Sequence, residues 1–227
     1  MPILLSIETS NNNCSVCISI NGEIAALREN NEGNLHASLL TPFIEAVLTE
    51  AGIKAQQLDA VCLSSGPGSY TGLRIGASAA KAICYATGKP LIAVSTLMAM
   101  VAGYIAMHGE PKANAVFCPM IDARRMEVYA ALYNSQLTEI KPAAPWILTE
   151  ENFFTEYLEN HNIVCLGNGA LKGTELLLTD RITIDGNSHL SALNLVNIAE
   201  EKFKIRAFEE TTYFEPIYLK TTPIKQP

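Results

Sequence analysis

The order of strand-like and helix-like segments is the feature that most restricts the fold of this 227-residue chain. The chain opens with three strand patterns, Ile3–Glu8, Cys14–Ile20 and Glu23–Arg28, and the last two are joined by the hairpin signal Asn21-Gly22. Helix-spaced apolar residues then alternate with short apolar runs. Such alternation predicts a mixed α/β sheet covered by helices.

The first half continues this alternation up to a polar break over residues 109–114. The predicted elements are a helix over Leu39–Leu48, a strand over Ala60–Ser64, a glycine-rich turn over Gly66–Gly72, a helix over Leu73–Thr87, a strand over Leu91–Val94 and a helix over Thr96–Met107. Pro42 lies inside the first of these helices and predicts a late start or a kink.

The second half repeats the same order in shortened form. The predicted elements are a hairpin of Ala115–Ile121 and Val128–Tyr133, a loop with Pro142 and Pro145, a helix near Glu150–Glu159, a strand over Ile163–Leu166, a short helix, a strand over Ile182–Ile184 and a helix over Ala192–Phe203. We therefore expect two lobes, residues 1–108 and a smaller one of residues 109–227, with the C-terminal segment packing back on the first. This organisation suits a nucleotide-binding fold of the actin or sugar-kinase kind.

The charge of the chain restricts its partners. Sixteen Lys and Arg residues against 23 Asp and Glu give a formal net charge of −7, and the cations are scattered along the sequence. Affinity for a nucleic-acid backbone comes from clustered Lys and Arg. We therefore expect the isolated chain to bind RNA weakly, if at all.

The cysteines and the apolar segments indicate the compartment. Four of the six cysteines lie in apolar strand patterns, and Cys14 and Cys17 stand at an odd offset that points them to opposite faces of a strand. The N-terminus lacks the cationic region of a signal peptide, and the most apolar stretch, Leu91 to Met107, falls short of a membrane span. We expect a cytoplasmic chain with no membrane association.

The most distinctive local pattern is Gly66 to Arg74, with the sequence GPGSYTGLR. A glycine loop between a strand and a helix can hold an anion with its backbone amides. This one lacks both the Lys-Ser/Thr pair of a phosphate loop and the G-x-G-x-x-G spacing. A tight structural turn capped by Thr71 and an anion site remain as alternatives, and residue chemistry favours the turn.

Carboxylates end the first strand of each half. Glu8 is followed by Thr9 and Ser10, and Asp122 ends the hairpin strand. In a two-lobed fold these strand ends face one cleft, where carboxylates could hold Mg²⁺ beside phosphates. Turn chemistry is the competing interpretation of both segments.

A metal site is not expected at His36. The positions one helical turn further on hold Leu39 and Leu40, so a second ligand is missing. The sequence also contains neither H-E-x-x-H nor G-x-S-x-G. We therefore expect no metal and no cofactor in the isolated chain.

The helix after the glycine turn is small and apolar nearly all round. Gly76, Ala80 and Cys84 follow one another at intervals of four and line one face, while Ala77 and Lys81 continue the adjacent ridge. Such a helix is buried on most sides. Its second face meets either another layer of the same chain or a partner.

These residues together resemble the TsaB (YeaZ) family, whose members are bacterial subunits of tRNA threonylcarbamoyladenosine synthesis. The resemblance covers about residues 3–170 and is specific in the first half. Its signature loop contains Gly66, Gly68, Ser69, Thr71, Gly72 and Arg74. The other matching segments are Glu8-Thr9-Ser10, His36 with Leu39-Leu40-Thr41-Pro42, Val94-Ser95-Thr96-Leu97, Asp122-Ala123-Arg124-Arg125 with Glu127-Val128-Tyr129, and Gly167-Asn168-Gly169-Ala170.

The resemblance implies an actin-like (ASKHA, ribonuclease H-like) two-lobed fold and a scaffolding role without catalysis. The implied catalyst is the paralogue TsaD, which transfers threonylcarbamoyl to adenosine 37 of ANN-decoding tRNAs. The ATPase TsaE is implied in the same assembly, as are a homodimer when the paralogue is absent and contact with tRNA only through the complex. The paralogue has a metal-binding histidine pair on its first helix, and Leu40 stands at the second position here.

The resemblance and the small-residue helix together predict a partner interface on two helices of the first lobe. The expected interface residues are Leu39, Leu40, Phe43, Val47, Gly76, Ala77, Ala80, Lys81 and Cys84. An Ala80→Glu substitution is then expected to abolish pairing. The expected vestigial nucleotide cleft consists of Glu8, Thr9, Ser10, Asp122, Gly167 and Gly169. Met126 departs from the family, which commonly has Gly after the two arginines.

The competing hypothesis is an enzyme. An ATP-dependent small-molecule kinase or carbamoyltransferase would use Glu8, Asp122 and the glycine turns in its own cleft between the lobes. An enzyme requires binding of metal and nucleotide by the isolated chain, whereas a scaffold requires only its partner.

Overall fold

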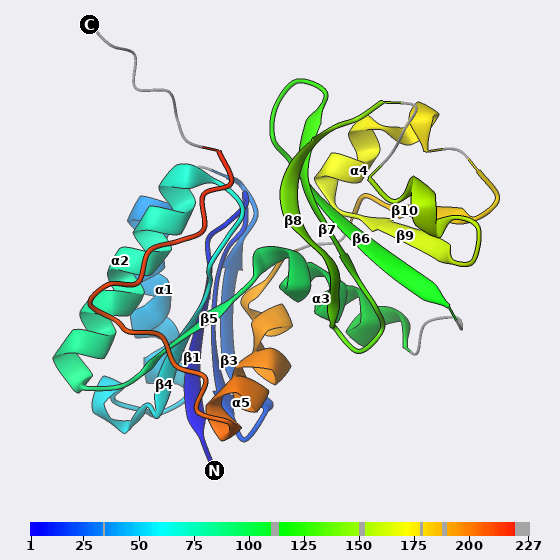
Figure 1. The fold of residues 1–227 in the computed structure, drawn as a ribbon. Coiled ribbons are helices and arrows are strands. Elements are labelled where there is room, and N and C mark those ends of the chain that lie inside the picture. Colours follow the sequence, from blue (N-terminus) through cyan, green and yellow to red (C-terminus); the bar gives the residue numbers. More distant parts are fainter. Residues whose placement is uncertain (34, 110–113, 150–152, 178, 188–189, 221–227) are drawn as a thin grey trace, which may run out of the picture. The chain divides into compact units, whose positions relative to one another are not determined.

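The computed structural model describes the chain except for residues 34, 110–113, 150–152, 178, 188–189 and 221–227. It divides into two compact units, Met1–Gly103 with His189–Pro216 and Tyr104–Ser188 with Ile217–Pro227. Each unit is built on a five-stranded mixed sheet flanked by helices (Figure 1). Within the residues described, no helix combines the length and the apolar character that crossing a membrane requires.

The first sheet has the strand order β3-β2-β1-β4-β5. Its strands are β1 (Ile3–Glu8), β2 (Cys14–Ile20), β3 (Glu23–Asn30), β4 (Ala60–Ser64) and β5 (Leu91–Val94). The first three pair antiparallel, while β4 and β5 run parallel to β1. The predicted hairpin is confirmed, because Asn21 and Gly22 both have the positive φ that a tight hairpin turn requires.

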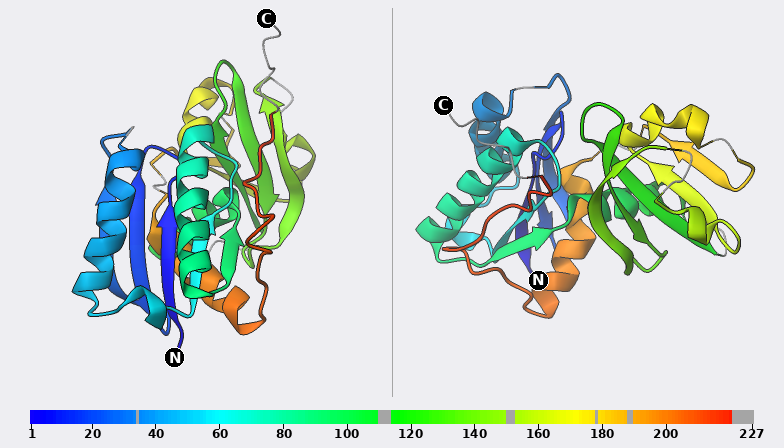
Figure 2. Two further views of the ribbon diagram at one scale, coloured as in Figure 1. Left: turned by 90° about the vertical axis from the view of Figure 1, so that its left-hand side faces the viewer. Right: turned by 45° about the horizontal axis from the view of Figure 1, so that its top comes forward.

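Helices cover both faces of this sheet. On one face α1 (His36–Glu50) and α2 (Tyr70–Thr87) lie side by side (Figure 2, left), and their apolar residues form one core with the sheet. The 3-10 helix η4 (Ala192–Leu195) and α5 (Val196–Lys204) lie on the other face, where Val196 packs against Cys17. The helix α3 (Thr96–His108) leads into the second unit.

The second sheet has the order β10-β9-β6-β7-β8 and repeats the topology of the first. Its strands are β6 (Ala115–Asp122), β7 (Glu127–Tyr133), β8 (Glu139–Ile147), β9 (Asn162–Leu166) and β10 (Ile182–Asp185). As in the first unit, an antiparallel meander is followed by two parallel strands. The predicted echo is confirmed, and α4 (Asn168–Lys172) replaces the much longer α2.

Two predicted elements of the second half are wrong. The segment with Pro142 and Pro145 was expected as a loop, but it forms the strand β8. This strand is at the edge of its sheet, where one row of backbone groups needs no partner strand and proline is tolerated. The helix expected near Glu150–Glu159 begins outside the described residues, and its remainder is one 3-10 turn, Thr155–Tyr157.

The boundary between the units also differs from the predicted one at residue 108. It falls within α3, and the segment with η4 and α5 returns to the first unit. There the backbone N–H of Ala192 donates to Ser15 Oγ at 2.9 Å. The following segment lies beside α2 (Figure 2, left), where Lys81 Nζ donates to the carbonyls of Thr212 and Phe214 at 3.1 Å.

The start of α2 lies against the end of β1. A Cβ atom at Gly72 would stand 2.0 Å from the carbonyl oxygen of Thr9, and one at Gly76 would stand 2.3 Å from Thr9 Oγ1. Gly68 is equally close, because its Cβ would stand 2.3 Å from the carbonyl oxygen of Ser10. The helix can therefore take this position only where side chains are absent.

Gly72→Ala is expected to lower the free energy of unfolding by about 2 kcal/mol, because the new methyl group meets a backbone atom that cannot rotate away. Ala82→Gly on the exposed side of α2 is the matched control, and it should cost about 1 kcal/mol through helix propensity. Urea denaturation measures both. A Gly72→Ala variant that gains stability, as propensity alone predicts, would contradict the close approach.

Candidate functional site

The signature loop is a structural turn. Ser69 is the N-cap of α2: its Oγ accepts a hydrogen bond from the Gly72 N–H at 3.2 Å, and its own N–H donates to the Ser10 carbonyl at 2.6 Å. The predicted cap, Thr71, is wrong because α2 begins three residues earlier than expected and already contains it. The amides that an anion would need from Ser69 and Gly72 are thus already bonded, one to the Ser10 carbonyl and the other to Ser69 Oγ.

Glu8, at the end of β1, is fully buried beneath this loop. Its Oε1 accepts hydrogen bonds from Ser10 N–H and Ser10 Oγ, both at 2.6 Å. Its Oε2 has no partner among the described residues. Burial raises the pKa of Glu8 and outweighs the Ser10 hydrogen bonds, which act in the opposite direction. A fully buried carboxyl group whose charged form is disfavoured in this way is a poor ligand for Mg²⁺.

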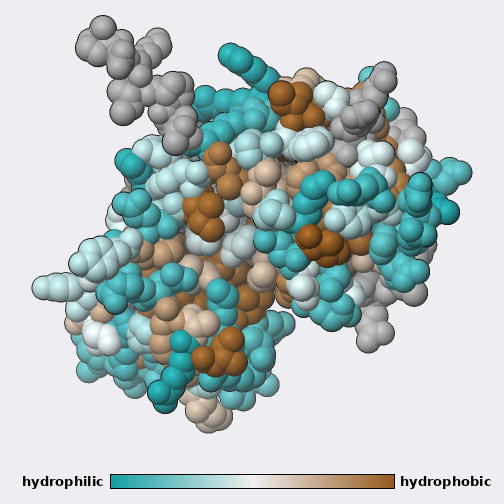
Figure 3. All heavy atoms as spheres, in the orientation of Figure 1, coloured by the Kyte–Doolittle hydropathy of each residue, from teal (hydrophilic) through white to brown (hydrophobic). Residues whose placement is uncertain are grey.

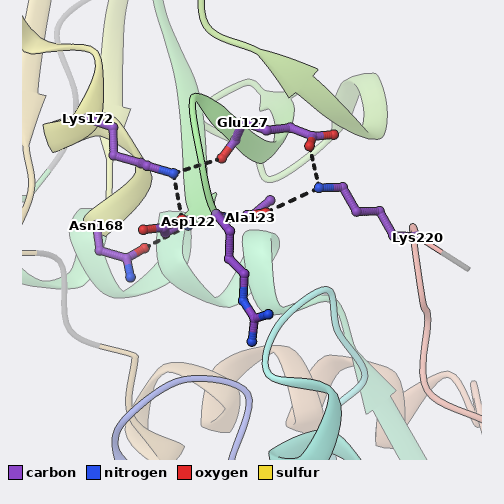
Figure 4. Close-up of polar contacts among 7 residues, drawn as sticks. Asp122, Ala123, Glu127, Asn168, Lys172 and Lys220 are labelled. Carbon is purple, nitrogen blue, oxygen red and sulfur yellow. Dashed lines mark hydrogen bonds and ion pairs between the residues drawn. The ribbon is translucent and has the colours of Figure 1, made fainter. Parts of the chain in front are cut away.

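Asp122, the corresponding strand end in the second unit, is engaged in an ion pair. Its Oδ1 accepts from Lys172 Nζ and from the Arg124 N–H, both at 2.6 Å (Figure 4). Its own N–H donates to Asn168 Oδ1 at 3.0 Å. Partial burial raises the pKa of Asp122, but these hydrogen bonds and the nearby positive charges outweigh it and lower the pKa below its ordinary value. Asp122 therefore acts as an ionised brace within the second unit.

The second glycine turn holds α4 against β6. Gly167 precedes the helix with a positive φ of 85°. A Cβ at Gly169 would stand 2.8 Å from the carbonyl oxygen of Met120. The second unit thus repeats the close approach of helix and strand seen at Gly72.

The residues of the predicted nucleotide cleft do not fit a magnesium-nucleotide site. Glu8, Thr9 and Ser10 are buried in the first unit, and Asp122 is paired with a lysine in the second. Throughout the described ranges, no group of three or more His, Cys, Asp or Glu side chains gathers where it could hold a metal ion. No reaction step follows from these residues.

His36 and the cysteines have structural surroundings. His36 is buried, and its Nε2 donates to the carbonyl of Asn13 at 3.3 Å. Cys14 and Cys17 point into the cores on opposite faces of the first sheet, which confirms the prediction from their spacing. Burial raises the pKa of Cys14 to about 11 and that of Cys17 to about 12, so both thiols remain protonated at neutral pH.

The small face of α2 is turned inward, against the interface prediction. Ala80 is fully buried, and Ala77 and Cys84 belong to the same core between α2 and the sheet. The small residues allow α2 to approach its own sheet rather than another chain. Leu40, Val47 and Gly76 are also buried, Leu39 and Phe43 pack against the core, and Lys81 is bonded to the C-terminal segment. Ala80→Glu would therefore test folding, not docking.

A groove of about 560 Å³ instead lies between α1 and α2 on their outward side. The lining residues are Ala37, Leu40, Thr41, Tyr70, Thr71, Arg74, Ile75, Ser78 and Ala79. Arg74 is the one charged residue of this lining, and its guanidinium lies 4.3 Å from the centre of the Tyr70 ring. The sequence signal that could have identified this face is the scarcity of charge along the outward positions of α2.

Glu8→Gln is expected to raise the free energy of unfolding at pH 7 by about 1–3 kcal/mol, since a neutral amide avoids burying an unsatisfied carboxylate. Because the pKa of Glu8 is raised in the fold, the folded chain releases this proton at a higher pH than the unfolded chain does. The stability contributed by protonated Glu8 is therefore lost as the pH rises above the ordinary value of 4.5.

Urea denaturation of both proteins between pH 4 and 8 measures this difference. The control is Glu23→Gln on the exposed part of β3, which should change stability by less than about 0.5 kcal/mol. Parallel pH curves for the natural chain and Glu8→Gln would show that Glu8 titrates as an ordinary carboxylate in the fold.

Comparison with known proteins gives the family. Residues 31–151 match the family model described as "TsaD: tRNA N6-adenosine threonylcarbamoyltransferase". The tRNA threonylcarbamoyladenosine biosynthesis protein TsaB of Haemophilus influenzae is 27% identical over 96% of this chain and 93% of its own length. The TsaB of Buchnera aphidicola is 31% identical over 70% of each chain.

A solved structure agrees with these matches. YeaZ from Pseudomonas aeruginosa superposes with a TM-score of 0.82 at 25% identity and covers 96% of this chain and all of that one. The two mixed sheets, the signature turn and the relatives of nearly equal length lead to one conclusion. This chain belongs to the TsaB (YeaZ) family of tRNA threonylcarbamoyladenosine biosynthesis proteins, with the two-lobed actin-like fold.

Proposed function

We propose that this chain is a non-catalytic subunit on which the catalytic paralogue TsaD depends to transfer threonylcarbamoyl to adenosine 37 of ANN-decoding tRNAs in the cytoplasm. The observation that carries this proposal is the outward groove between α1 and α2, an exposed helix pair with one charge in its lining. The pathway is inferred from the relatives of this chain, which are named as tRNA threonylcarbamoyladenosine biosynthesis proteins.

The groove has the chemistry of a docking surface. Ser78 and Thr41 are exposed and uncharged, and Tyr70, an aromatic residue, is 46% exposed. Aromatic residues are enriched and charged ones depleted at the centres of protein interfaces. On the face of the molecule in Figure 3, by contrast, hydrophilic residues cover most of the second unit.

We assign this surface to TsaD. The TsaD family model matches residues 31–151 of this chain, a range that contains both α1 and α2. A TsaD chain therefore has counterparts of the same two helices, so one helix pair can pack on the other across an approximate two-fold axis. A second copy of this chain would use the same surface when TsaD is absent, which gives the homodimer, and TsaE joins the assembly of the two paralogues.

The competing function, a kinase or carbamoyltransferase acting in its own cleft, has no observation in its favour. Glu8 is buried and its pKa is raised by that burial, and Asp122 is paired with Lys172. The glycine turns, which could have bound phosphate, pack against strand ends instead.

Ser78→Glu is expected to weaken pairing with TsaD by about a hundredfold or more, because docking would desolvate an unpaired carboxylate. Ser78 is exposed on α2, so the substitution leaves the core of the unit intact. The matched control is Asn197→Glu, an exposed position on α5 at the opposite face of the sheet. Co-purification and light scattering measure pairing, and circular dichroism checks folding.

Reconstitution tests the function itself. TsaD, TsaE, ATP, a threonylcarbamoyl donor and an ANN-decoding tRNA should yield modified tRNA only when this chain is added. Ser78→Glu should behave like omission, and Asn197→Glu like the natural chain. Full activity of TsaD without this chain would overturn the proposal, and so would modification by this chain without TsaD.

A further inference from the structure

Two arginines occupy the tip of the hairpin between β6 and β7. Arg124 and Arg125 have φ values of 69° and 50°, and both are exposed. Ala123 N–H donates to the Glu127 carbonyl at 3.0 Å and Glu127 N–H to the Arg124 carbonyl at 3.2 Å, so residues 123–126 form a four-residue turn whose two positive φ values Asn and Gly adopt most readily. Arginine is a poor choice for such a turn, so its presence twice calls for a reason other than turn formation.

Two ion pairs brace this tip from other parts of the chain. Asp122, before the tip, is paired with Lys172 of α4. Glu127, after the tip, is paired with Lys220 of the C-terminal segment, whose Nζ also donates to the Ala123 carbonyl at 3.2 Å (Figure 4). Both acids at the base of the hairpin are thus neutralised by lysines.

The pairing of both acids with lysines leaves the two arginines outside the ion pairs of the hairpin. Neither guanidinium forms an ion pair with any other residue that the structure describes. Four cations against two acids give this small region an excess of two positive charges, although the chain as a whole carries −7. The local charge at the tip is therefore positive, whereas the net charge of the whole chain is negative.

We propose that Arg124 and Arg125 bind phosphodiester groups of the tRNA while this chain is paired with TsaD. The proposal rests on the proposed function, which brings a tRNA to the complex. The guanidinium group is a planar fork that donates two parallel hydrogen bonds to phosphate oxygens. Two such groups on a projecting turn contact neighbouring phosphates without reading the base sequence.

The surroundings of the tip favour RNA over a protein partner. Ala123 and the half-exposed Met126 flank the arginines in the chain, and the two acids and the two lysines that brace the hairpin surround them. Interfaces with nucleic acids are polar and positively charged, whereas the centres of protein interfaces are depleted of charge. Two phosphate contacts on an acidic chain are too few for binding by itself, so the tip adds to the affinity of the complex.

The test replaces the two arginines by the residues that the turn prefers. Arg124→Asn with Arg125→Gly removes both charges and suits the positive φ values, so the melting temperature should stay the same or rise. The affinity of the complex with TsaD for an ANN-decoding tRNA should fall about tenfold or more. The slope of log K against log salt should become shallower by about 1 to 2, as expected for two lost phosphate contacts.

Two further variants serve as controls in the same fluorescence anisotropy assay. Lys54→Ala with Arg206→Ala makes the same change in net charge at exposed positions of the first unit and should leave tRNA affinity within about twofold. Arg124→Lys with Arg125→Lys keeps the charge without the fork and should retain most of the salt dependence. Inorganic phosphate should weaken tRNA binding no more than chloride does at the same ionic strength, because the proposed ligand is the RNA backbone and not a free phosphate ion.

Each other outcome overturns the inference. The first is an Asn-Gly variant whose tRNA affinity and salt slope are unchanged. The second is a Lys54/Arg206 control that loses as much tRNA affinity as the Asn-Gly variant. The third is an Asn-Gly variant that binds tRNA normally but no longer captures TsaD or TsaE, which would make the tip a protein contact. Failure of the arginine site can be distinguished from failure of the proposed function. A complex that forms and modifies tRNA with the Asn-Gly variant at full affinity contradicts only the arginine site, whereas TsaD that needs no partner contradicts the function.

Discussion

The carbonyl oxygen of Thr9, at the end of β1, stands where a side chain at Gly72 would have to be. This close approach seats the N-terminal turn of α2 directly on the central strand of the first sheet. Ser69 then caps the helix and bonds to Ser10, and Ser10 in turn donates to Glu8. The amides of Ser69 and Gly72 and one oxygen of the Glu8 carboxyl group are thus bonded within the fold, while Glu8 Oε2 has no partner among the described residues.

The same contact explains which face of α2 is turned toward the sheet. Because glycine and alanine bring the helix so close to the sheet, its small face becomes core, and the larger side chains of Tyr70, Arg74 and Ile75 are left beside α1. The groove is therefore a by-product of tight packing on the inner side. One arrangement of residues thus both buries the end of β1 beneath α2 and leaves the groove on the outward side of α1 and α2.

The sequence was sufficient for the fold class, since strand and helix periods and the Asn21-Gly22 turn depend on local physics. It was insufficient for the direction of the small face, because spacing shows which residues share a face but not what that face contacts. The strand β8 escaped prediction since Pro142 and Pro145 are acceptable only at a sheet edge, which is a property of the assembled sheet. No repeating sequence pattern marks the two arginines at the hairpin tip as a site. They are distinguished only by their positive φ values and by the lysines from α4 and the C-terminal segment, which pair with the neighbouring acids.

The C-terminal segment joins features that are distant in the sequence. It lies along α2, where Lys81 holds two of its carbonyls, and it then reaches the second unit, where Lys220 pairs with Glu127. A chain shortened before Lys220 would leave the Glu127 carboxylate without this partner, beside two arginines. Loss of Lys220 would lower the excess at the hairpin tip from two positive charges to one, so the last described residue of the chain supplies half of the positive excess there.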